Sequence, residues 1–93
     1  MTNNTAARKA GLTSINQVAA FQVIAAGPEN MITIATRLGI STAAVTGIAD
    51  KLEKLGLIER IRGRQDRRSV WLKLTEQGQA LAARLATPEA VTA

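Results

Sequence analysis

The side chains with the clearest capacity for chemistry are the basic ones between Lys51 and Lys73. This segment holds eight of the twelve Lys and Arg residues and only three acids, so its charge of +5 equals the net charge of the whole chain. Basic charge concentrated in one part of a small domain favours an anionic partner, nucleic acid above all. The alternative is a charged segment that is merely solvated.

Other kinds of chemistry find little support in the composition. The chain has no Cys and no His, which excludes disulfides, cysteine-based redox sensing and thiolate or imidazole metal sites. The seven acids are scattered, and no nucleophile–base arrangement is visible. We therefore predict a protein that is not an enzyme and has no cofactor. Phe21 and Trp71 are the only aromatic residues, so the core must be built from Leu, Ile, Val and Ala, and Phe21 is expected to be part of it.

Apolar spacing predicts the elements that position the basic segment. Helices are expected over 14–26, 31–38, 42–55 and 76–86, and two strands over 57–62 and 69–74 enclose a polar loop. Thr13 or Ser14 caps the first helix, and Asn30, Ser41 and Thr75 cap the others. Gly27-Pro28, Gly39 and Gly56 end the first three.

One domain over residues 12–86 is expected, with a flexible arm over 1–11 and a flexible tail over 87–93. No apolar run approaches the roughly 20 residues needed to span a bilayer, and the N-terminus lacks the hydrophobic region of a signal peptide. We expect a cytoplasmic, nucleoid-associated protein of a bacterium or archaeon, without a membrane partner.

The turn Gly39-Ile40-Ser41 between two predicted helices is typical of a helix-turn-helix. Together with the basic hairpin it predicts a winged helix-turn-helix: mainly α with a small β-wing (α+β), in the order α-α-α-β-β-α. In such a fold the third helix enters the major groove, and the wing reaches the backbone or minor groove beside it.

The stretch from Ile34 to Gly78 resembles the winged helix of MarR-family regulators. The motifs that carry the resemblance are Ile34-Ala35, Ser41, Leu52 to Arg60 (LEKLGLIER), Asp66-Arg67-Arg68 and Leu74 to Gly78 (LTEQG). Taken together they extend the resemblance over roughly residues 12–86. It implies sequence-specific binding of double-stranded DNA and transcriptional regulation, with repression favoured over activation.

Members of the family are usually longer than this chain. They carry an extra N-terminal helix and a long C-terminal helix that make the dimer and shape a ligand pocket. Here an eleven-residue arm precedes the first helix, and the last helix is expected to stop near Ala86. We therefore expect a weak homodimer and no small-molecule effector.

Candidate contacts with DNA fall into two groups. The reading helix offers hydroxyls, small apolar groups and one cation, namely Ser41, Thr42, Ala43, Thr46, Gly47 and Lys51. The wing offers Arg62, Arg64, Arg67, Arg68 and Lys73. Asp66 is expected to shape the wing by pairing with Arg68, although Arg68 can also contact DNA. The alternative for each helix residue is an ordinary solvated face, and Asp50 is expected to be structural or ion-paired.

Two questions stay open at this point. Trp71, on the outer face of the hairpin, can pack on a neighbouring strand residue, a helix or a second subunit, and plain packing is favoured. The domain as a whole can also serve as a protein-interaction module, which this fold supports. Salt-sensitive DNA binding distinguishes that function from DNA recognition.

Overall fold

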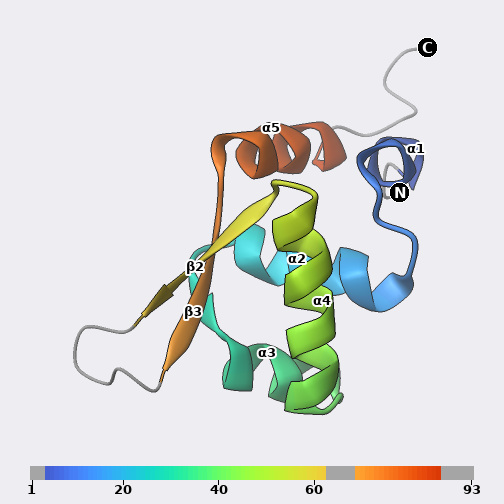
Figure 1. Cartoon of the computed structure of the whole chain (residues 1–93). Helices are drawn as coiled ribbons and strands as arrows, with labels where there is room; N and C mark the ends of the chain where they lie inside the picture. The colour runs from blue at the N-terminus through green and yellow to red at the C-terminus, as the bar shows by residue number, and fades with distance from the viewer. Residues whose placement is uncertain (1–3, 63–68, 87–93) are drawn as a thin grey trace.

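The computed structural model describes residues 4–62 and 69–86, which form five helices and three strands (Figure 1). In chain order they are α1 (Asn4–Ala10), α2 (Ile15–Ala25), β1 (Glu29–Asn30), α3 (Met31–Leu38), α4 (Thr42–Lys54), β2 (Ile58–Arg62), β3 (Val70–Leu74) and α5 (Glu76–Leu85). The predicted helices and hairpin strands are all present, with ends within two residues of those expected. The predicted order lacked α1 and β1.

Side-chain caps explain where four of the helices begin. Each capping oxygen accepts a hydrogen bond from the backbone amide three residues later, which satisfies a donor that the first turn leaves without a partner. The caps are Ser14, Asn30, Ser41 and Thr75. Gly39 follows α3 with a φ of 67°, the left-handed conformation predicted for it. Because these signals are local, the sequence alone was enough to place these helix starts.

The three strands form an antiparallel sheet in the order β1-β3-β2. Ile58 is the partner of Leu74, and Arg62 is the partner of Val70, so the hairpin is in register along its described length. Leu72 and Leu74 of β3 are buried on the inner face, whereas Trp71 and Lys73 occupy the outer face. β1 is only two residues long, too short to show an alternating pattern, which is why the sequence did not reveal it.

The hydrophobic core lies between α2, α4, α5 and the inner face of the sheet. Phe21 and Ile24 of α2 are almost fully buried at its centre. Leu52 of α4 and Leu72 of β3 belong to the same buried cluster. Each helix thus turns one apolar stripe inward and leaves the opposite face exposed.

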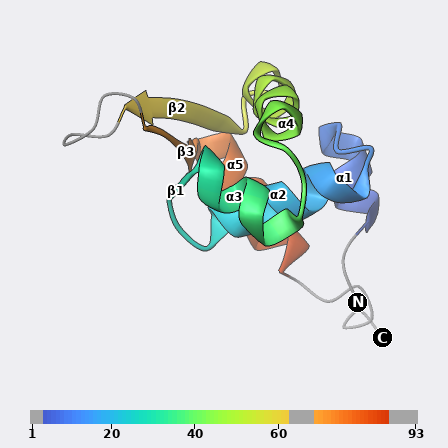
Figure 2. The same cartoon turned by 90° about the horizontal axis from the view of Figure 1, so that it is seen from below.

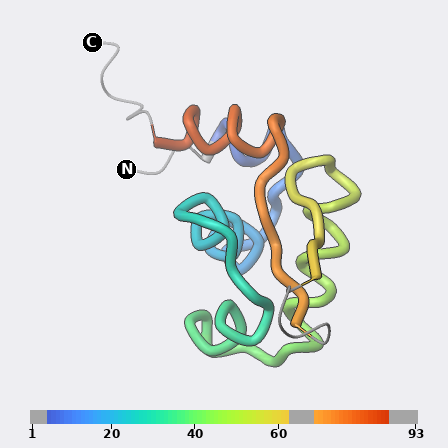
Figure 3. The backbone as a smooth tube through the Cα atoms, turned by 90° about the vertical axis from the view of Figure 1, so that its left-hand side faces the viewer, coloured from blue at the N-terminus to red at the C-terminus, as the bar shows by residue number. Residues whose placement is uncertain are grey.

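The prediction of a flexible arm over residues 1–11 is wrong for residues 4–10, which form α1. Ala6 and Ala7 are buried in the core, together with Leu12 just after the helix. α1 contacts α5, as Figure 3 shows from the side. Residues 4–10 contain no large apolar side chain to mark them as part of the core, because the buried positions of α1 are alanines. Residues 1–3 and the predicted tail over 87–93 lie outside the described residues.

Within the described residues, no single helix has the length and apolar composition needed to cross a membrane. Among the helices that the structure describes, α3 and α4 reach that length and composition only when taken together, and a bend of 111° separates them.

Candidate nucleic-acid interface

The corner between α3 and α4 holds the second helix at a steep angle to the first. The chain bends by 111° there, close to the angle between the two helices of a helix-turn-helix. Ile40 donates its backbone N–H to the Ala35 carbonyl at 3.0 Å, and Ser41 Oγ accepts from the Ala44 amide at 3.0 Å. These bonds fix the start of α4, and the predicted helix-turn-helix is confirmed.

Helix α4 has a buried face and an open one. Val45, Ala49 and Leu52 point into the core. All six predicted reading residues are exposed: Ser41, Thr42, Ala43, Thr46, Gly47 and Lys51. By helical spacing, five of them lie in two rows, one through Ala43, Gly47 and Lys51 and another through Thr42 and Thr46, and Ser41 caps the helix before them. The structure thus gathers these candidates on one continuous open surface, which the sequence pattern had predicted.

The hydroxyl of Thr46 is already oriented. Its Oγ1 donates a hydrogen bond to the Thr42 carbonyl at 3.1 Å, one turn back along α4. A hydroxyl has one donor and two acceptor lone pairs, so in this orientation Thr46 presents acceptors outward. The base amino groups exposed in the major groove, adenine N6 and cytosine N4, are donors that match such an acceptor.

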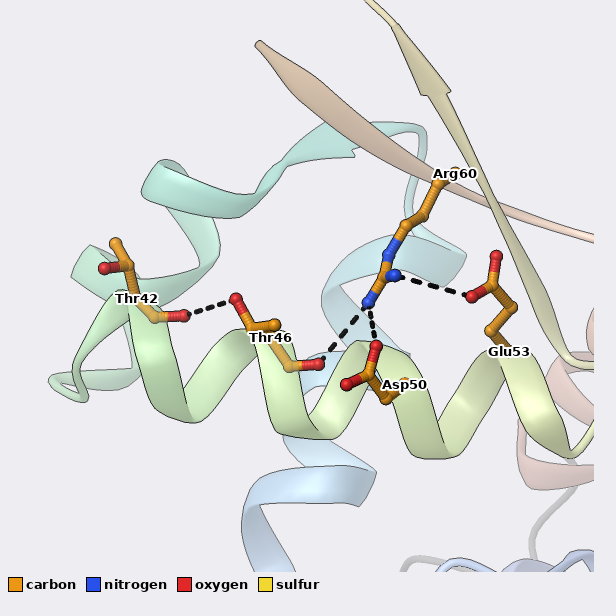
Figure 4. A network of polar contacts seen from close by, with 5 residues as sticks. All are labelled: Thr42, Thr46, Asp50, Glu53 and Arg60. Carbon is orange, nitrogen blue, oxygen red and sulfur yellow. Dashed lines mark hydrogen bonds and ion pairs between the residues drawn. The ribbon is translucent and has the colours of Figure 1, made fainter. Parts of the chain in front are cut away.

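Arg60 of β2 reaches across to the row of Thr42 and Thr46 (Figure 4). Its Nη2 donates to Asp50 Oδ1 at 2.5 Å and to the Thr46 carbonyl oxygen at 3.4 Å. Its Nη1 lies 3.5 Å from Glu53 Oε1. The expectation that Asp50 is ion-paired is therefore confirmed. Arg60 itself was not singled out from the sequence, although strand alternation places it on the same face as buried Ile58, toward α4.

The hairpin divides its basic residues between two faces. Arg62 ends β2 on the same face as Arg60 and is exposed, with no ion pair to another described residue. Lys73 lies on the opposite face, where its Nζ is 3.7 Å from Glu59 Oε1 of the adjacent strand. Of these two wing candidates, the structure thus brings only Arg62 to the side of α4. Arg64, Asp66, Arg67 and Arg68 lie outside the described residues.

The outer face of the sheet accounts for Trp71. This residue is half-buried, and its partners across the neighbouring strands are Asn30 of β1 and Ile61 of β2. Residues opposite each other in antiparallel strands place their side chains side by side. The sheet itself therefore provides packing neighbours for Trp71, which was the favoured expectation. Figure 2, seen from below, shows the hairpin extending away from the helices.

Known proteins resemble this chain in sequence or in fold. An uncharacterized HTH-type transcriptional regulator of Bacillus subtilis, YfiV, is 42% identical over 48 residues, which are 52% of this chain and 30% of that protein. The transcriptional regulator BldR from Sulfolobus solfataricus has a TM-score of 0.73 at 29% identity, covering 96% of this chain and 73% of that one. Staphylococcus aureus MepR, solved with DNA, has a TM-score of 0.80 at 21% identity, covering 87% and 67%.

The match to this chain spans about a third of the length of the curated relatives. A family model adds the last comparison: the model described as "MarR family" matches residues 22–70, just over half of the chain, from the middle of α2 to the start of β3. The matched region contains the whole helix-turn-helix and β2. This chain belongs to the MarR family.

Proposed function

We propose that this protein binds double-stranded DNA sequence-specifically and regulates transcription, with repression favoured over activation. One observation carries the proposal: α4 exposes two open rows of small and polar side chains beside a hairpin rich in arginine. Small side chains let a helix approach base edges closely, and hydroxyls and methyls supply contacts to bases. The names of the relatives, transcriptional regulators, support the same function.

We assign the cations around α4 to general affinity for DNA and the small and polar residues of α4 to recognition of bases. Lys51 and Lys54 lie in the last turn of α4, and Arg62 ends β2. We assign these three cations, with Arg64, Arg67 and Arg68 of the wing loop, to phosphates and to the minor groove beside the reading helix. Thr42, Ala43, Thr46 and Gly47 then face the bases, and Ser41 at the helix start contacts a phosphate. Lys73, paired on the opposite face, is assigned a weaker part in the interface.

We further propose that two copies bind together as a weak dimer. One module of this kind usually buries too little surface for strong site selection. α1 and α5 lie at the end of the molecule away from the α3–α4 corner (Figure 3), so pairing through them leaves both reading helices accessible. Ala80 and Ala83 are exposed on α5 and allow close approach of a second helix. We place this regulator in the cytoplasm, where bacterial and archaeal DNA lies.

Selection of bound duplexes from a random library tests the proposal directly. We expect an enriched palindromic sequence whose half-sites are about 10 bp apart, because two-fold symmetry sets reading helices about 34 Å apart. Binding to the enriched duplex should also weaken steeply as the salt concentration rises. A selection that enriches no sequence, with binding insensitive to salt, would contradict DNA recognition and favour a protein-interaction module instead. An enriched site without two-fold symmetry would contradict the dimer alone.

A further inference from the structure

Arg60 makes every ion pair that joins α4 to the hairpin within residues 4–62 and 69–86. It meets three acceptors at once: the carboxylates of Asp50 and Glu53, and the backbone carbonyl of Thr46. Thr46 and its neighbour Gly47 belong to the turn that we expect to face bases. The guanidinium therefore contacts the reading surface through its backbone, at the Thr46 carbonyl (Figure 4).

This contact requires the shape of an arginine. A guanidinium is planar and carries five N–H donors in a fixed fork, so two terminal nitrogens can serve separate acceptors in one orientation. Lysine keeps the positive charge but ends in a single compact ammonium group. A site that needs only a cation accepts lysine, whereas a site that needs the fork does not. Replacing Arg60 by lysine therefore distinguishes a bridge between three acceptors from a simple contact with a phosphate.

The exposure of the three charged side chains argues against a role confined to folding. The side chains of Arg60, Asp50 and Glu53 are 32%, 62% and 45% exposed. Ion pairs this exposed are screened by water and add little to stability. Their electrostatic effect on a bound polyanion is larger, because two carboxylates without a cation between them would stand on the helix that approaches the phosphates.

We propose that Arg60 is a positioning residue for sequence reading: it fixes the Thr46–Gly47 turn of α4 relative to the wing and neutralises Asp50 and Glu53, instead of binding a phosphate itself. This inference rests on the proposed function. It predicts that the ratio of affinities for a specific and a random duplex depends on the fork of Arg60, whereas general affinity for DNA depends only on its charge.

Arg60→Lys tests the proposal, with two duplexes of equal length as probes: one enriched by the wild-type chain and one of random sequence. We expect binding to the random duplex, and its salt dependence, to stay as in the wild type. The specificity ratio should fall about tenfold, because the turn that reads bases is no longer held. Arg37→Lys is the matched control, since Arg37 of α3 also makes an exposed ion pair, with Glu29 at 3.6 Å. It should leave the ratio unchanged.

Asp50→Asn removes the negative charge of the carboxylate that Arg60 contacts and keeps the shape of the side chain. It should also lower the specificity ratio, and the double variant with Arg60→Lys should be no less specific than the worse single variant, because both changes break one bridge. Melting temperatures of all variants should stay near that of the wild type. Retention of the full ratio by Arg60→Lys, or independent and additive losses, would overturn the positioning role. A wild-type chain that prefers no duplex would overturn the proposed function, and this inference with it.

Discussion

Two helical glycines, Gly47 and Gly78, differ in whether the fold leaves room for a larger side chain. Gly47 lies in the middle of α4 and is exposed, and a Cβ added there would meet no atom within 4 Å. Gly78 lies in the first turn of α5 and is buried, and a Cβ there would overlap the Leu57 carbonyl oxygen and lie 3.2 Å from Leu74 Cδ2. The fold thus requires a glycine in α5, whereas in α4 the fold leaves the position open. Packing therefore does not determine which residue occupies position 47, and we expect DNA binding to determine it.

The largest effect is expected from Gly78→Ala. The new methyl group would push α5 away from the backbone at Leu57, which also accepts a hydrogen bond from the Thr75 amide at 3.0 Å. We expect a loss of about 3 kcal/mol of unfolding free energy, the upper range for an overfilled core. Thermal denaturation would measure it as a fall of roughly 10–20 °C in Tm. A Tm within about 3 °C of wild type would show that α5 shifts without cost.

The double variant Arg64→Ala/Arg67→Ala tests the open side through its charge. We expect weaker binding to every duplex and a slope of log K against log salt that is smaller in magnitude by about 2, one unit for each lost phosphate contact. Stability should not change. Arg8→Ala/Lys9→Ala is the matched control, because it removes the same charge from two exposed positions on α1, at the end of the molecule away from the α3–α4 corner (Figure 3). Equal slopes for the two double variants would remove the wing from the interface.

Thr46→Val keeps the shape of the side chain and removes the acceptor oxygen that α4 presents. We expect discrimination between the selected and a random duplex to fall by about 1 kcal/mol, roughly fivefold, the net value of one hydrogen bond. Thr36→Val is the control, since Thr36 Oγ1 makes the same back-bond to the Ile32 carbonyl, at 3.0 Å, on α3. If both variants retain full specificity, Thr46 reads no base through its hydroxyl.

Gly47→Ala should have the smallest effect, and of the opposite sign to Gly78→Ala. Alanine favours an exposed helix interior over glycine by about 0.5–1 kcal/mol, and the space around Gly47 is empty. A denaturant titration should therefore show a slightly more stable protein. A destabilised variant would mean that the contrast between the two glycines is not one of packing.

The sequence predicted elements whose signals are local. Ser14, Asn30, Ser41 and Thr75 each mark a helix start by themselves, and alternation marks β3. It did not predict α1, because that helix is buried through alanines against α5, an element some seventy positions later in the chain. Contacts between such distant segments leave no periodic trace in a small-residue stretch.

The candidate site divides in the same way. The open face of α4 follows from helical periodicity, and the six predicted contacts with DNA are all exposed there. The partner of Asp50 is Arg60, ten residues away on another element, and only the tertiary fold selects it from the eight basic residues of the segment. Arg62 and Lys73 lie on opposite faces because Arg62 is paired with Val70 and Lys73 with Glu59, and this register is a property of the folded hairpin.

The contact of α1 with α5 also bears on the order in which this chain folds. α1 has seven residues, too few for a stable isolated helix in water. Its buried alanines find their packing partners only in the tertiary fold, and the contact with α5 closes almost the whole length of the chain, at a cost in loop entropy. The helix-turn-helix and the hairpin join residues that are close in sequence, so we expect them to form before the contact between α1 and α5. We therefore expect α1 to be the last segment to dock and the first to detach, so that its helical signal reports the completed fold.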